Sequence, residues 1–133
     1  MVVEPNVSVG PVHSGMTMQQ VVTQLGEPDQ KSDGKMLYGN LGFEVDFGPG
    51  GKVEQVVCSA GDNSGITKSF GGQTKEGIGI GATRAEVVRA YGNPAPIKSD
   101  QEQGAETMLY VSPGVAFQLS HDKVSMMYVR LMK

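Results

Sequence analysis

The side chains that could carry chemistry are few, and they lie far apart in the sequence. His13 and His121 are the only histidines, and neither has a second metal-binding side chain at ligand spacing. A zinc or copper site needs three or four convergent ligands, so the sequence predicts no metal site. The serines lack a neighbouring base and a nucleophile-elbow motif, which argues against acyl transfer. We therefore expect no catalytic residue and no cofactor.

Two other sequence patterns are candidates for a binding or catalytic site. Residues 77–81 alternate glycine and isoleucine, but they lack the spacing of a dinucleotide-binding loop and the lysine of a P-loop. We interpret them as an approach to a helix in which Ile78 and Ile80 anchor the chain. Glu44 and Asp46 lie two residues apart in an alternating segment, so they share one face of a strand. They could act as paired carboxylates, and the alternative is that they are ordinary solvent-facing acids.

Two short helices are predicted by start and stop signals that recur half a chain apart. Thr17 and Thr83 each precede a Gln or Glu by three residues, which is the pattern of a capping box. Gly26 and Gly92 tolerate a positive φ at the helix ends, and a proline follows each of them two residues later. Helices of this length are marginal alone, so they must pack against a larger element.

The segments after each predicted helix have the period of strands. Residues 43–47 alternate apolar and acidic side chains, and residues 115–119 repeat the alternation of apolar positions. Further strands are expected in the apolar segments at 35–40, 53–58, 107–111 and 124–131. The spacers are too short for parallel crossovers, so we expect antiparallel hairpins.

The matched halves predict a single domain over residues 1–133 that contains two tandem repeats. The repeats cover residues 12–58 and 74–131, and a linker spans 59–73. The expected fold class is α+β: two helix-plus-antiparallel-strand repeats form one continuous curved sheet with helices packed on one face. We expect the lone Cys58 to be a small buried residue, and the alternative is a reactive thiol. Phe70 either anchors the linker in the core, which we favour, or is an exposed contact.

The remaining candidate for function is the concave face of the sheet, which the helices leave uncovered. If the apolar residues of 43–47 and 115–119 point at the helices, their neighbours point the other way. Aligning Val53 with Val124 then places apolar side chains of the last strands beside the acidic pair. We predict a binding face of seven residues: Glu44, Asp46, Gln55, Val57, Gln118, Met126 and Tyr128. Aromatics and Met are enriched in interface cores, although long strands also expose single apolar side chains.

Composition and charge narrow the range of partners. The formal net charge is −3 and the 11 Lys and Arg are scattered, so no basic stripe for nucleic acid is expected. No apolar run approaches the ~20 residues of a membrane span. Residues 1–5 lack the basic and apolar segments of a signal peptide. Two interpretations stay open: a cytosolic protein, or an exported one whose signal or lipid anchor lies outside this sequence.

A family resemblance rests on the repeated motif. The first half reads Gly-Met-Thr at 15–17, Leu-Gly-Glu-Pro at 25–28, Leu-Tyr at 37–38 and Gly-Phe at 42–43, and residues 74–92 carry a related pattern. This pattern resembles the repeat of the β-lactamase-inhibitor-protein (BLIP) superfamily, and its helix-then-sheet unit is similar to that of SmpA/BamE-type lipoproteins. The resemblance implies a concave sheet face available to a partner, in exported or envelope-associated proteins without enzymatic activity.

We therefore expect a non-catalytic binding module of a bacterial protein, placed outside the cell, in the periplasm or in the cell envelope. Its expected partner is another protein, bound through the concave face. Inhibition of a β-lactamase is not expected, because the chain has no Trp and only four Tyr, residues that dominate tight interfaces. The alternative is a small-ligand or metal-binding protein with a pocket near Glu44, Asp46, Tyr110 or His121.

Overall fold

The fold is mostly β. The computed structural model describes residues 2–61, 68–93, 105–110 and 114–131. Of these residues, 47% lie in strands and 15% in helices, and the strands form two sheets rather than one. The expected α+β class, in which two helix-plus-strand repeats form a single continuous sheet, was therefore wrong. The reason is physical: the two helices have only eight residues each, whereas strands also occupy segments with no visible period.

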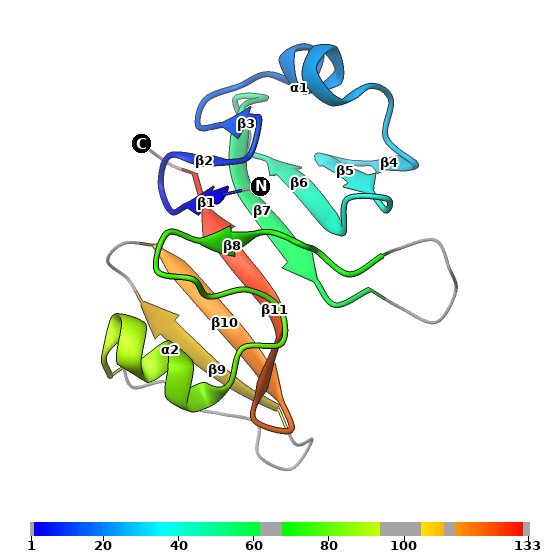
Figure 1. Ribbon diagram of the computed structural model, residues 1–133. Helices are drawn as coiled ribbons and strands as arrows, with labels where there is room; N and C mark the ends of the chain where they lie inside the picture. Colours follow the sequence, from blue (N-terminus) through cyan, green and yellow to red (C-terminus); the bar gives the residue numbers. More distant parts are fainter. Residues whose placement is uncertain (1, 62–67, 94–104, 111–113, 132–133) are drawn as a thin grey trace.

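The larger sheet has seven strands in the order β4-β5-β6-β7-β11-β10-β9, and all its neighbouring pairs are antiparallel. Within each half, this agrees with the antiparallel hairpins that the short spacers predict. Its strands are β4 (Gln30–Ser32), β5 (Lys35–Tyr38), β6 (Phe43–Phe47), β7 (Val53–Ser59), β9 (Ala105–Tyr110), β10 (Val115–Ser120) and β11 (Lys123–Arg130). The last strands of the two predicted halves, β7 and β11, therefore pair at the centre of the sheet (Figure 1).

The smaller sheet has four short strands in the order β3-β2-β1-β8. They are β1 (Val2–Glu4), β2 (Ser8–Val9), β3 (Val12–His13) and β8 (Gln73–Thr74), and β1 pairs with β8 in parallel. Val3, Val9 and Val12 are fully buried, so this sheet belongs to the core. The sequence analysis missed it because strands of two or three residues are too short to display a period of two.

Both helices begin at capping boxes, as predicted: α1 (Met18–Leu25) and α2 (Arg84–Tyr91). Thr17 Oγ1 accepts a hydrogen bond from the Gln20 amide at 3.2 Å, and the Gln20 side chain accepts one from the Thr17 amide at 2.8 Å. Thr83 and Glu86 repeat this arrangement at 3.2 and 2.9 Å. The helix starts therefore follow from local sequence alone.

Matched contacts tie each helix to the large sheet. The Tyr38 hydroxyl donates to the carbonyl of Gly26 at 2.9 Å, and the Tyr110 hydroxyl donates to the carbonyl of Gly92 at 2.8 Å. These bonds satisfy carbonyls at the helix ends that have no partner within the helix. Each helix also buries one valine completely: Val21 in α1 and Val87 in α2.

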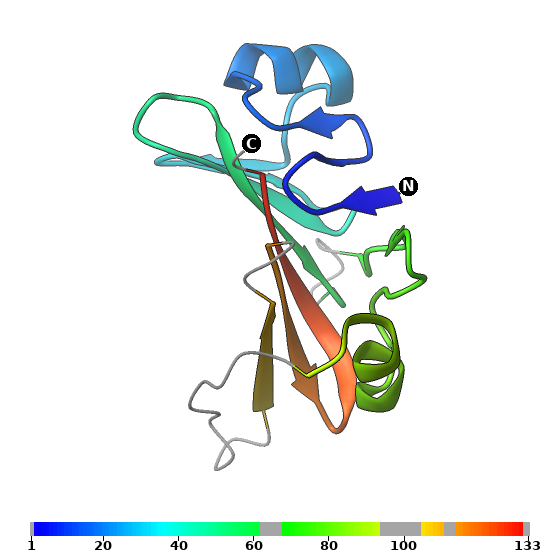
Figure 2. The ribbon, with the colours of Figure 1, turned by 90° about the vertical axis from the view of Figure 1, so that its left-hand side faces the viewer.

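The helices and the small sheet lie on the same side of the large sheet, and the other face carries no helix or strand of the described segments (Figure 2). On the covered side, Phe43, Val45 and Phe117 are almost fully buried. Cys58 is fully buried there, as predicted. Phe70 is buried as well, with its ring edge-on to Phe43 at 6.1 Å between centroids, which confirms the predicted anchor.

We expect the substitution Thr17→Ala to lower the free energy of unfolding by about 1 kcal/mol, because the Gln20 amide loses its capping acceptor. Urea denaturation measures the change. Gln19→Ala, an exposed substitution in the first turn of the same helix, is the matched control and should change stability by less than about 0.5 kcal/mol. Equal effects of the two substitutions would contradict the cap assignment.

Candidate functional site

The seven residues of the predicted binding face all lie on the uncovered face of the large sheet. Glu44 on β6 lies opposite Val57 on β7, which in turn lies opposite Tyr128 on β11. Met126 on β11 lies opposite Gln118 on β10. All seven are partly exposed, whereas buried residues alternate with them along each strand. The structure thus brings the predicted set together, and whether the set binds a partner stays a prediction.

Glu44 and Asp46 differ from ordinary surface acids because they are partly buried. Asp46 Oδ2 accepts a hydrogen bond from Gln55 Nε2 at 3.1 Å, whereas the buried Oδ1 meets no N–H or hydroxyl donor from the described residues. Burial raises the pKa of Glu44, the hydrogen bond and charge of Asp46 raise it further, and Lys35 opposes the rise from 4.0 Å. A protonated Glu44 can donate to Asp46, which relieves the repulsion between two carboxylates.

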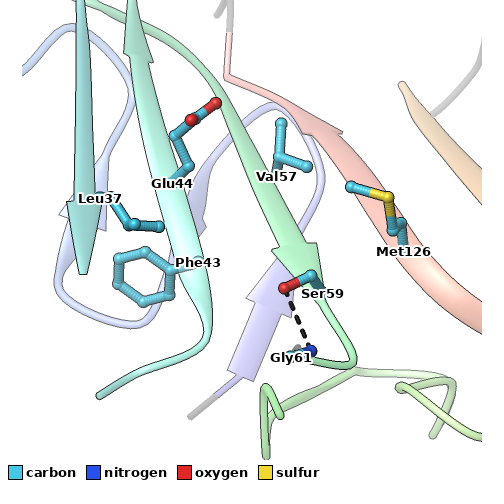
Figure 3. A pocket seen from close by; sticks show the side chains of 7 residues that line it. All are labelled: Leu37, Phe43, Glu44, Val57, Ser59, Gly61 and Met126. Atoms are coloured by element: carbon cyan, nitrogen blue, oxygen red, sulfur yellow. Dashed lines mark hydrogen bonds between the residues drawn. The ribbon is translucent and has the colours of Figure 1, made fainter. Parts of the chain in front are cut away.

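A pocket of about 200 Å³ opens beside this acidic pair. Figure 3 shows Glu44, Val57 and Met126 on three successive strands, with Ser59 and Gly61 at one end. The complete lining is Leu37, Phe43, Glu44, Val57, Ser59, Gly61 and Met126. A single carboxylate therefore stands among apolar side chains, an arrangement that suits a cation with an apolar stem. We call this hollow the Glu44 pocket.

A second pocket, of about 170 Å³, lies on the same face over the other half of the sheet. Its lining is Gln55, Leu109, Tyr110, Gly114, Val115, Ala116, Tyr128 and Arg130. Here the charged side chain is the exposed Arg130. No ion pair to Arg130 is found within the described segments. We call this hollow the Arg130 pocket.

Tyr128 stands between the two halves of the face. Its hydroxyl donates to Gln118 Oε1 at 3.3 Å and lies 3.6 Å from the sulfur of Met126. A wider hollow of about 460 Å³ adjoins the Glu44 pocket at Ser59, Gly61 and Met126 and extends to Gln118. The hollows therefore cover both sides of a central aromatic side chain.

The other candidate reactive residues lie apart from the acidic pair. His13 is an exposed residue of β3. His121 lies in the turn between β10 and β11, and its φ of 54° is a positive value typical of such turns. Tyr110 lines the Arg130 pocket, but its hydroxyl is bound to the helix end. Burial raises the pKa of the Cys58 thiol, which disfavours the reactive thiolate.

Two absences in the described part of the chain bear on the candidate site. Among the described residues, no three or more His, Cys, Asp or Glu side chains gather where they could hold a metal ion. No helix in the part of the chain that the structure describes has the length and apolar character to cross a membrane. The predicted absence of a transmembrane segment agrees with this finding.

The predicted binding face omitted several residues that line the two pockets, among them two leucines, a serine and an arginine. Leu37 and Leu109 lie on the outer strands, and Ser59 and Arg130 lie at the ends of the central ones. The parity that identifies Val57 and Tyr128 also includes Ser59 and Arg130, two residues further along each strand. Extending the alternation by one step would have found Ser59 and Arg130.

Comparisons with known proteins give information on the fold only. Models of protein families give no match to this chain, and neither do curated proteins. A solved structure with a similar backbone is that of a DUF4309 family protein (YjgB) from Bacillus subtilis subsp. subtilis str. 168. The TM-score is 0.56 at 10% sequence identity, over 86% of this chain and 77% of that one. The likeness shows the fold alone. The resemblance to the BLIP repeat stays a prediction.

The raised pKa of Glu44 has a consequence for stability. Because the folded state binds the Glu44 proton more tightly than the unfolded state does, wild-type stability falls as the pH rises through this pKa. Glu44→Gln removes the penalty, so its stability relative to wild type should increase as the pH rises above about 4.3, the ordinary pKa of Glu. Urea denaturation at pH values below and above this pKa measures the difference.

Glu54→Gln, at a partly exposed acid on the neighbouring β7, provides the control for loss of one negative charge. The pH-dependent gain should be larger for Glu44→Gln. A stability difference between Glu44→Gln and wild type that stays constant with pH would contradict the assignment.

Proposed function

We propose that this protein is a non-catalytic binding module that binds another protein through the uncovered face of its seven-stranded sheet. The observation that supports this most directly is the composition at the centre of that face, where Val57, Met126 and Tyr128 are partly exposed on adjacent strands. Aromatic and Met side chains are enriched in interface cores, and Tyr is a frequent hot spot. Helices and a second sheet cover the opposite face, so they leave this one to a partner.

Charged groups surround this apolar centre. Glu44 and Asp46 lie on one flank, and Arg130 lies on the other half of the face. Charges at the rim of an interface add little affinity, but they select the partner and its orientation. The face thus combines an apolar centre with a polar surround, which is the usual anatomy of a protein interface.

Pocket size favours a protein over a small molecule. The Glu44 and Arg130 pockets measure about 200 and 170 Å³, below the ~300 Å³ at which small-molecule sites usually begin. The hollow of about 460 Å³ is large enough, but it is lined mostly by small side chains and has no charged group in its lining. Pockets of this size suit single side chains of a protein partner.

The BLIP-like repeat supports the wider setting of the proposal. Proteins of the family that this chain resembles are typically exported or envelope-associated, so we place this module in the extracellular space, the periplasm or the cell envelope of a bacterium. An anchor outside this sequence would be compatible with binding through the face. A β-lactamase is not the proposed partner, because the chain is poor in the aromatics that tight inhibition requires.

A site-specific crosslinking experiment tests the proposal. A photoreactive amino acid replaces Val57 at the centre of the face, and the matched control replaces Gln19, an exposed residue of α1. In the source organism, we expect a discrete protein adduct from position 57 that is absent from position 19. Mass spectrometry identifies the partner, which is then purified for binding measurements.

With the purified partner, Tyr128→Ala should raise Kd at least about fivefold, because a central aromatic contact is lost. Gln19→Ala should leave Kd unchanged, and circular dichroism checks that both variants fold. Identical adducts from positions 57 and 19, or no effect of Tyr128→Ala, would overturn the proposal.

A further inference from the structure

The two halves of the large sheet correspond contact by contact. The Gly42 amide donates to the Tyr38 carbonyl at 3.0 Å, and the Gly114 amide donates to the Tyr110 carbonyl at the same distance. The strand register shifts after Asp46 on β6 and after Gln118 on β10. The central strands β7 and β11 pair antiparallel, with Val57 opposite Tyr128. A rotation about this pair would therefore place one half of the sheet on the other.

The same correspondence relates the Glu44 pocket to the Arg130 pocket. Each is formed by an outer strand, its inner neighbour and the central pair. Residues of the first pocket have these counterparts in the second, in order: Leu37, Phe43, Glu44, Val57, Ser59 and Met126 correspond to Leu109, Val115, Ala116, Tyr128, Arg130 and Gln55. One binding geometry therefore occurs twice on the face.

The two copies differ in charge. Glu44 in the first pocket corresponds to the neutral Ala116, and Arg130 in the second corresponds to the neutral Ser59. Asp46 adds a second acid beside Glu44. The opposing cation Lys35 has its Nζ 4.0 Å from Glu44 Oε2, and its side chain is more than half exposed. The face therefore presents an acidic pocket and a basic pocket of similar size.

We infer, on the basis of the proposed function, that the partner presents an extended segment carrying one basic and one acidic side chain. The basic side chain enters the Glu44 pocket, where its methylene groups pack against Leu37, Val57 and Met126 and its head group meets the carboxylate. The acidic side chain enters the Arg130 pocket, where the guanidinium can hold a carboxylate through two hydrogen bonds.

Strand geometry sets the spacing of the two side chains. Glu44 and Arg130 lie two strands apart and one same-face step apart along the strands. At roughly 4.8 Å between strands and 6.7 Å per same-face step, their Cα atoms are separated by about 12 Å. Residues i and i+4 of an extended segment are about 13 Å apart and point to the same side. The two charges are therefore expected four positions apart.

A second copy of this chain fits the face less well. A symmetric face-to-face dimer could bring the acidic pocket of one copy over the basic pocket of the other. Two hollows facing each other would leave voids, however, and interface cores are packed as densely as protein interiors. Protruding side chains of a different segment fill the hollows.

Selection from a displayed library of short random peptides tests the inference with the intact protein as the target. We expect the enriched peptides to share a basic and an acidic residue four positions apart. The double variant Glu44→Gln/Arg130→Gln should not enrich such a pair, and a double variant at exposed or partly exposed charges off the face, Glu76→Gln/Arg89→Gln, should enrich it as wild type does.

An enriched peptide is then synthesised and its Kd measured by fluorescence polarisation. Glu44→Gln and Arg130→Gln should each raise Kd about fivefold, and each loss should disappear when the matching charge of the peptide is neutralised. Enrichment without the spaced charge pair, no enrichment, or a dimer in sedimentation that Tyr128→Arg dissociates would overturn the inference. A protein adduct at position 57 would leave the proposed function standing in each case.

Discussion

The antiparallel pairing of β7 with β11 is the interaction on which the rest of the structure depends. It joins the halves of the chain into one seven-stranded sheet and places Val57 directly opposite Tyr128. The ladder is extended at both ends, by the Ala60 amide donating to the Ser125 carbonyl and the Leu131 amide donating to the Glu54 carbonyl, each at 2.9 Å. Without this pair, each half would expose an edge strand and present only part of the candidate site.

Local signals in the sequence predicted the helices and several strands. They predicted less well how distant segments are arranged in the two sheets. The capping residues Thr17 and Thr83 and the alternation of residues 43–47 act over a few positions, so they could be interpreted directly. The small sheet could not be found this way, because Val3, Val9 and Val12 gain their burial from segments distant in the sequence. The face of the candidate site followed from parity, whereas its pockets depended on which strands meet at the centre.

The candidate site also shows how far side chains can differ where the backbone contacts of the two halves of the large sheet agree. Hydrogen bonds that hold the backbone recur in both halves, for example from Tyr38 and Tyr110 to the helix ends. The side chains above that backbone have no such constraint, so Glu44 and Ala116 occupy corresponding positions. The residues that form the core and the residues of the candidate site thus lie on opposite faces of the same strands.

The position of Cys58 has a practical consequence. This thiol is fully buried on β7 directly opposite Met127 of β11, beneath the pairing that joins the halves. A thiol reagent can reach it only when that part of the sheet opens, so the rate of labelling under native conditions measures the opening free energy of the centre of the molecule. The protein therefore contains its own reporter of whether the two halves are held together.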